Sequence, residues 1–179
     1  VAMDPNTGSI LALAGVKHDL ETGEISADAL GTITNVFVPG SVVKAATLTA
    51  GWQYGAISGN QSFVDQPILF AGSAPINSWF TAYGSRSITA VEALEYSSNT
   101  YMVQVALNML GTPYSPNMAL GTNNVDASMK KLRSTFAEYG LGTETGIDLP
   151  TESTGYIPKN FTVSNYITDA FGQFDNYTP

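Results

Sequence analysis

Two residues, Ser41 and Lys44, have types and a spacing that suit nucleophilic catalysis. On a helix, positions i and i+3 share a face, so the Lys44 amine can reach the Ser41 hydroxyl. A serine hydroxyl is a weak nucleophile until a base takes its proton, and a neutral lysine can be that base. Free N–H groups in the first helical turn would stabilise an oxyanion formed beside Ser41. The pair therefore predicts acyl transfer through a serine.

The surroundings of Lys44 favour this interpretation. Between Asp28 and Asp65, Lys44 is the only residue charged at neutral pH. A helix that is apolar on nearly every face is a buried helix, and burial disfavours an ammonium and lowers its pKa. We therefore expect a lysine that can act as a general base. The neighbours that make this segment apolar are Val42, Val43, Ala45, Ala46, Leu48 and Ala50.

The spacing alone is weak evidence, because it recurs at Ser128–Lys131. That second match lies in an amphipathic segment beside Lys130 and Arg133, and we interpret it as a solvated helix face. A non-catalytic alternative also stays open for the first match. In that alternative Ser41 caps its helix and Lys44 extends to solvent.

A second polar group, Ser97-Ser98-Asn99, lies in a short connector between two predicted helices. A hydroxyl there could relay a proton, and an amide side chain could bind a substrate amide. The same S-x-N pattern occurs at 58–60 and 115–117, in long loops where Ser and Asn are ordinary turn residues. The non-catalytic alternative is that residues 97–99 serve as a helix N-cap.

The elements that must position these groups follow from local patterns. The order of strands followed by helices predicts an α+β fold. We expect a hairpin over 1–15, a loop over 16–35 and a helix over 41–54. Loops with short elements should follow over 55–86, and then a helix over 87–95 capped by Ser87 or Thr89. Helices are expected over 98–110 and 124–139, a loop over 112–123, and loop with short pieces over 141–179.

Composition excludes several classes of function. The 179 residues suit one domain or one large piece of a domain. A net charge of −8 with only 7 Lys and Arg argues against nucleic-acid binding, which needs cations to neutralise phosphates. The chain has no cysteine and a single histidine, so thiol catalysis and multi-histidine metal sites are excluded. A Ser-His-Asp triad would depend on His18, beside Asp19 in a polar stretch.

The two ends of the sequence suggest a piece of a longer protein. Val1 is no initiator residue, and Thr178-Pro179 has the pattern of a helix start. No apolar run approaches the roughly 20 residues that span a bilayer.

Taken in order, a series of segments resembles the transpeptidase domain of class B penicillin-binding proteins, and the resemblance is close to the 2b type of that class. No one segment is specific, but their order and spacing match the family over nearly the whole chain. The segments are Met3–Leu13, Val38–Lys44, Glu95–Tyr101, Tyr139–Gly142, Thr145–Pro150 and Ala170–Pro179.

The resemblance implies a fold and a set of roles. The fold would be a partial serine transpeptidase or β-lactamase-like α+β fold. Residues 1–179 would be the N-terminal portion of the domain, truncated at both ends, with a hairpin of the central sheet and most of the helical subdomain. Ser41 would be acylated by a peptidoglycan stem peptide or by a β-lactam, and Lys44 would take its proton. Ser97 would pass a proton to the leaving amine and Asn99 would bind the acyl chain's amide, with no metal or organic cofactor.

One departure from the family is large. The family's third motif is Lys-Thr-Gly on a strand that lines the site, and no Thr-Gly of this chain follows a lysine. We expect that strand, most of the central sheet and a membrane anchor to lie outside the chain, so that this piece alone is inactive. The parent would act at the outer face of the cytoplasmic membrane with other cell-wall synthesis proteins. The alternatives are a serine β-lactamase or β-lactam sensor, and a non-catalytic surface or binding domain.

Overall fold

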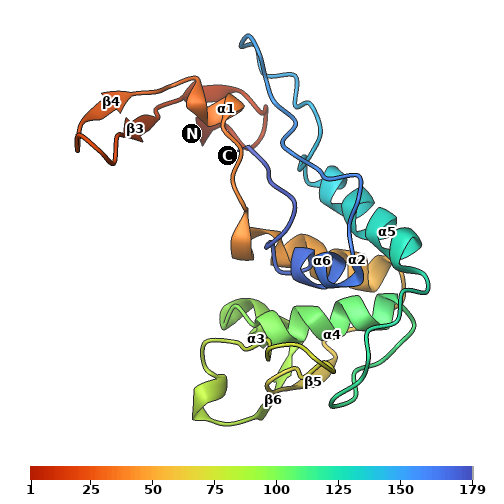
Figure 1. The fold of residues 1–179 in the computed structure, drawn as a ribbon. Helices are drawn as coiled ribbons and strands as arrows, with labels where there is room; N and C mark the ends of the chain where they lie inside the picture. Colours follow the sequence, from red (N-terminus) through yellow and green to blue (C-terminus); the bar gives the residue numbers. More distant parts are fainter. Residues whose placement is uncertain (179) are drawn as a thin grey trace.

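The computed structural model describes residues 1–178, and its core is a group of packed helices (Figure 1). Helix α4 touches α2 and α6, and α5 packs on α2 and α6. The two N-terminal hairpins lie apart from this group, with the two chain ends near one another. The core helices are α2 (Lys44–Gln53), α4 (Asn99–Met109), α5 (Val125–Glu138) and α6 (Val163–Asp169).

The predicted N-terminal hairpin is confirmed, and a second hairpin follows where a loop was expected. Strands β1 (Ala2–Met3) and β2 (Ile10–Ala12) pair antiparallel, as do β3 (Val16–His18) and β4 (Ile25–Ala27). All residues of β3 and β4 are exposed, so neither strand has the apolar alternation that marks a half-buried strand.

The same turn closes both hairpins. The carboxylate of Asp4 accepts a hydrogen bond from the Asn6 N–H, and that of Asp19 accepts from the Glu21 N–H. In each turn a glycine N–H four residues later donates to the aspartate carbonyl. The repeated Asp-x-x-Thr-Gly pattern at 4–8 and 19–23 was therefore the available signal for the missed hairpin.

A short helix and a 3₁₀ turn lead into the first core helix. Helix α1 (Gly31–Thr34) falls in the stretch expected to be loop, and Gly40–Val43 forms a 3₁₀ turn before α2. The helical run over 41–54 is thus confirmed, except that its first turn is 3₁₀. No side chain caps either segment, so the alternative in which Ser41 is an N-cap is wrong.

A third hairpin and two short elements follow. Strand β5 (Ser62–Asp65) pairs antiparallel with β6 (Arg86–Thr89), and a 3₁₀ turn covers Thr81–Tyr83. Helix α3 (Ala90–Glu95) begins later than predicted, because Ser87 belongs to β6. Thr89 caps it, and Glu92 completes the capping box.

The predicted helices over 98–110 and 124–139 are confirmed within a residue at each end. Nearly every residue of α4 is buried, which makes it the central helix of the core. One expectation here is wrong. Ser128 is buried rather than solvated, and its hydroxyl donates a 3.1 Å hydrogen bond to the Met109 carbonyl.

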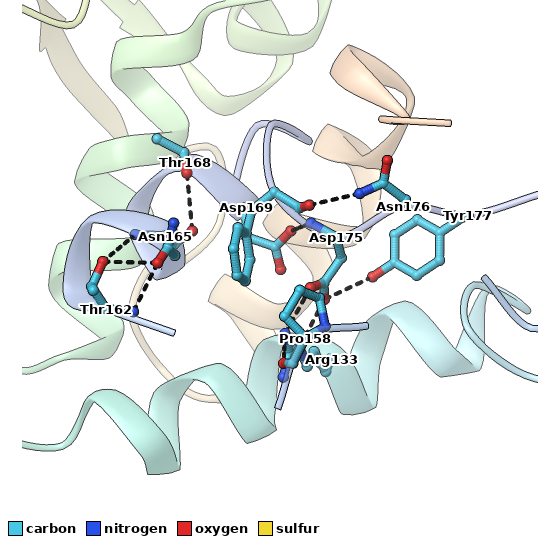
Figure 2. A network of polar contacts seen from close by, with 10 residues as sticks. Arg133, Pro158, Thr162, Asn165, Thr168, Asp169, Asp175, Asn176 and Tyr177 are labelled. Atoms are coloured by element: carbon cyan, nitrogen blue, oxygen red, sulfur yellow. Dashed lines mark hydrogen bonds and ion pairs between the residues drawn. The ribbon is translucent and has the colours of Figure 1, made fainter. Parts of the chain in front are cut away.

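The C-terminal segment contains a helix, α6, where only loop and short pieces were expected. A polar network holds the residues that follow it (Figure 2). Arg133 forms two hydrogen bonds with the buried Asp175 carboxylate, at 2.6 and 2.7 Å, and the Asp175 N–H donates to Asp169. The Tyr177 backbone then pairs with that of Phe37, just ahead of the 3₁₀ turn.

Helices with short antiparallel sheets make this an α+β fold. Within residues 1–178, no helix is both long and apolar enough to cross a membrane. The helix start expected at Thr178-Pro179 falls on a residue outside the described range.

Candidate active site

Ser41 lies exposed in the first turn of the helical run, directly after a tight backbone contact. The N–H of Gly40 donates a 2.9 Å hydrogen bond to the Gly172 carbonyl. Gly40 and Gly172 both have positive φ, and a side-chain carbon on Gly172 would collide with the Gly40 carbonyl. The C-terminal segment therefore holds the chain at the residue before Ser41.

Ser97 comes from the connector between α3 and α4 and lies opposite Ser41. Its φ of 53° is left-handed, a conformation that costs a residue with a side chain about 1 kcal/mol or more. This conformation places the Ser97 hydroxyl 2.9 Å from the Ser41 hydroxyl, to which it donates. The connector therefore brings together two serines that are 56 positions apart in the sequence.

Lys44 is buried, with 2% of its surface exposed, and its amine points to Ser97. Nζ donates to the Ser97 carbonyl at 2.7 Å and to the Ser97 hydroxyl at 3.0 Å. The expected direct reach from Lys44 to Ser41 is thus replaced by a chain through the Ser97 hydroxyl. The alternative in which Lys44 extends to solvent is wrong.

Burial lowers the pKa of Lys44 to about 8, while the negative charge of Asp65 acts in the opposite direction. Desolvation penalises the ammonium and leaves the neutral amine unaffected, which explains the sign of the larger effect. A lysine with this pKa is neutral in a useful fraction near neutral pH.

The three groups form a hydrogen-bonded chain that can move a proton. With Lys44 protonated, the hydrogen bonds run from Nζ to Ser97 Oγ and from Ser97 Oγ to Ser41 Oγ. With Lys44 neutral, the same contacts can reverse direction, because each hydroxyl can donate or accept. The Ser41 proton can then pass to Ser97 as the Ser97 proton passes to Lys44.

Asn99, the first residue of α4, lies on the same connector, and its amide donates to the Asn77 carbonyl at 3.3 Å. Ser98, between Ser97 and Asn99 in the sequence, is the N-cap of α4. The N-cap alternative for the 97–99 motif thus applies to Ser98 and not to Ser97 or Asn99.

Sequence reasoning missed the buried Asp65, whose carboxylate lies under this connector and accepts from the hydroxyls of Ser98 and Ser78. Asp65 comes at the end of β5, 33 positions before Ser98. Its only signal in the sequence was that it ends the charge-poor stretch around Lys44.

Other candidate groups do not come together. Among residues 1–178, no three metal-binding side chains form a cluster. His18 is exposed at the end of β3, a strand that lies apart from α2 (Figure 1). The second S-x-x-K pair does not form a comparable site: the buried Ser128 hydroxyl donates to the Met109 carbonyl, and the Lys131 amine lies over the Tyr54 ring, 5.1 Å from its centroid.

The chain matches known proteins along its whole length. A family model described as "Penicillin binding protein transpeptidase domain" matches residues 1–179. Penicillin-binding protein 2B of Streptococcus pneumoniae is 67% identical over all of this chain and 26% of its own length. Peptidoglycan D,D-transpeptidase FtsI of Escherichia coli is 30% identical over 89% of this chain and 24% of its own.

A solved structure of penicillin-binding protein 2B from Streptococcus pneumoniae strain R6 superimposes with a TM-score of 0.95, at 67% identity. It covers 99% of this chain and 29% of that one, so the chain spans about a quarter of the length of these relatives. The match over every residue and the fold agree, and the chain belongs to the penicillin-binding protein transpeptidase family.

Proposed function

We propose that this chain belongs to a peptidoglycan D,D-transpeptidase that crosslinks the cell wall and is inhibited by β-lactams, with Ser41 as the acylated nucleophile. The observation that carries the proposal is the chain from Ser41 through Ser97 to the buried Lys44. It supplies a nucleophile, a proton path and a base with a lowered pKa. The names of the relatives support the same reaction.

In the first half-reaction, Ser41 Oγ attacks the carbonyl of the penultimate D-alanine of a stem peptide. Its proton moves through Ser97 to Lys44, and the tetrahedral intermediate gains a negative oxygen that first-turn N–H groups stabilise. The intermediate collapses, the C–N bond breaks, and Ser97 passes a proton back to the departing D-alanine amine. Asn99 binds an amide of the acyl chain.

In the second half-reaction, the amine of another stem peptide attacks the ester carbonyl. The C–O bond to Ser41 breaks, the Ser41 oxygen takes up a proton, and a new amide crosslinks the two peptides. A β-lactam follows the first half-reaction only, because its opened ring stays attached to Ser41. The chemistry is acid–base and nucleophilic throughout and uses no cofactor.

Three wider aspects also belong to this proposal. Residues 1–179 are the N-terminal portion of the transpeptidase domain, and a Lys-Thr-Gly strand elsewhere in the parent completes the site. The parent works at the outer face of the cytoplasmic membrane, held by an anchor. Its partners are stem peptides and other proteins of cell-wall synthesis. The relatives' lengths support a larger parent, since each is about four times as long as the match.

The test is labelling of the full-length parent with a fluorescent penicillin, followed by mass spectrometry of the adduct. The wild type should carry the adduct on Ser41, and Ser41→Ala should lose it. The matched control is Ser128→Ala, which removes the serine of the other S-x-x-K pair and should label normally. An adduct that persists on another serine in Ser41→Ala contradicts the proposal. Rapid release of bound penicillin would favour the β-lactamase alternative.

A further inference from the structure

A carboxylate lies beneath the connector that carries Ser97, and the reaction described above makes no use of it. Asp65 is fully buried, at 0% exposure. Its Oδ2 accepts hydrogen bonds from the hydroxyl of Ser98 and, at 3.2 Å, from that of Ser78. Its Oδ1 has no hydrogen-bond partner among residues 1–178. A buried and half-satisfied carboxylate is costly, so its presence beside the site calls for a reason.

The nearest arginine does not account for it. Arg86 is the cross-strand partner of Asp65 in the β5–β6 hairpin. Its guanidinium instead stacks on the rings of Phe80 and Tyr96, 4.5 and 4.2 Å from their centroids. The one ion pair recorded for the described residues is elsewhere, between Arg133 and Asp175. Asp65 is therefore held by hydroxyl groups.

These hydroxyls form a cage that joins three segments. Ser78 Oγ lies 3.1 Å from both Ser98 Oγ and Thr100 Oγ1, and it accepts a 3.3 Å hydrogen bond from the Thr100 N–H. Ser98 Oγ also accepts from the Tyr101 N–H at 3.0 Å, which caps α4. The carboxylate is the one acceptor at the centre of this cage with no proton to give. It therefore sets the direction of the surrounding hydrogen bonds.

The cage acts on the residue next to it. The Ser98 hydroxyl is bonded to Asp65, while Ser97, with its left-handed φ of 53°, contacts Lys44 and Ser41. Such a backbone persists only where its surroundings over-determine it. In this conformation both oxygens of Ser97 accept from Lys44 Nζ.

We propose that Asp65 is a positioning residue for the acylation step, whose buried carboxylate holds Ser98 so that Ser97 keeps its hydroxyl between Lys44 and Ser41. The inference rests on the proposed function and adds to it a residue that touches neither substrate nor nucleophile. Asp65 also acts on Lys44 through its charge, since it favours the ammonium form. The charged groups on the neighbouring elements are Lys44 on α2, Arg86 on β6, and Glu92 and Glu95 on α3.

The test measures the acylation rate of the full-length protein by a chromogenic β-lactam across pH, in wild type and Asp65→Asn. The rate rises with pH as Lys44 loses its proton and then reaches a plateau. In Asp65→Asn the plateau should fall about tenfold or more, because Ser97 is less well held. The rising limb should also move to lower pH, because loss of the Asp65 charge lowers the pKa of Lys44 further. The matched control is Glu24→Gln, an exposed acid in the β3–β4 hairpin turn, with both features unchanged.

The proposal is overturned if the plateau acylation rate of Asp65→Asn is within twofold of wild type, or if the pH at which its rate rises is unchanged. If Asp65→Asn does not fold, Ser78→Ala decides, because it removes one donor to Asp65 and keeps the charge. The plateau acylation rate of Ser78→Ala should fall about fivefold, the equivalent of one net hydrogen bond. The pH at which its rate rises should stay unchanged. An unchanged plateau in a folded Ser78→Ala overturns the proposal as well. Failure of the proposed function would look different from failure of the Asp65 proposal. It would appear as penicillin labelling that persists in Ser41→Ala, independent of any result with the Asp65 variant.

Discussion

Gly172 lies directly against Gly40, and its carbonyl accepts the Gly40 N–H at 2.9 Å. A side-chain carbon at Gly172 would overlap the Gly40 carbonyl, so only glycine permits this approach. Because Gly40 precedes Ser41, the contact makes the C-terminal segment part of the support for the candidate nucleophile. The Gly172 N–H donates a 2.9 Å hydrogen bond to the Asp169 carbonyl, and the Asp169 carboxylate accepts the Asp175 N–H (Figure 2).

Gly172→Ala should therefore damage both stability and acylation. We expect the variant to lose about 2 kcal/mol or more from strain and from displaced backbone, and to acylate at least tenfold more slowly. The measurements are thermal unfolding and penicillin labelling of the full-length protein. Gly140→Ala is the matched control, because Gly140 also has a positive φ, 83°, but open space around it. If the two variants lose the same stability and both label normally, the contact has no role at Ser41.

The pKa of Lys44 predicts how acylation depends on pH. Because burial lowers the pKa to about 8, the acylation rate should rise with pH through that value as the neutral amine forms. Lys44→Arg keeps a positive charge but cannot lose it near pH 8, so its rate should fall about 100-fold or more. Lys17→Arg, on the exposed strand β3, is the control. A Lys44→Arg variant that acylates at the wild-type rate would exclude Lys44 as the base.

Ser97 offers a test that separates its hydroxyl from its backbone. Ser97→Ala and Ser97→Gly both remove the link between Lys44 and Ser41, so both should acylate at least tenfold more slowly. Glycine adopts a φ of 53° without the steric cost that alanine bears, so Ser97→Gly should be the more stable by about 1 kcal/mol. Thermal unfolding and stopped-flow acylation measure the two effects. Equal stability of the two variants would argue against backbone strain at this position.

The buried acid pair near α6 predicts a stability that depends on pH. Burial, and next the neighbouring charge of Asp175, hold the pKa of Asp169 well above its usual range, although Arg133 acts in the other direction. Between about pH 4 and the raised pKa, the folded chain keeps a proton that the unfolded chain has lost. Stability contributed by this group is therefore lost as pH rises through that window.

Asp169→Asn cannot lose this proton, so its thermal midpoint should fall less than that of the wild type between pH 5 and pH 8. Its side-chain oxygen can still accept the Asp175 N–H at 3.0 Å. The same comparison with Asp148→Asn, which changes an exposed acid, should leave the wild-type dependence intact. Parallel pH dependence in wild type and Asp169→Asn would show that Asp169 is ionised in the folded protein throughout.

Much of the local structure could be predicted from sequence, because its causes lie within a few residues. Thr89 and Glu92 satisfy the first N–H groups of α3, and Gly140 follows α5 as expected. The turn that begins at Asp4 closes the first hairpin through its own carboxylate. The exposed second hairpin was missed, since without a buried face it lacks the alternation that identifies a strand.

The candidate nucleophile and base were also visible in sequence, since the S-x-x-K spacing and the charge-poor stretch are local properties. The sequence also favoured Ser41–Lys44 over Ser128–Lys131, but its reason for setting the second pair aside, a solvated Ser128, is wrong. One lysine is buried against Ser97, and the other pair has its serine bonded to Met109. Sequence spacing determines which side chains share a helix face, but it does not determine which other residues pack against that face.

What the sequence by itself determined is the candidate pair Ser41 and Lys44 and the helical run that carries them. Only the tertiary structure decided that Lys44 reaches Ser41 through Ser97, and that Asp65 supports the connector from below. The physical reason is that these contacts join segments 33 to 56 residues apart. Their geometry depends on how α2, β5 and α4 pack together, and local propensity carries no information about that packing.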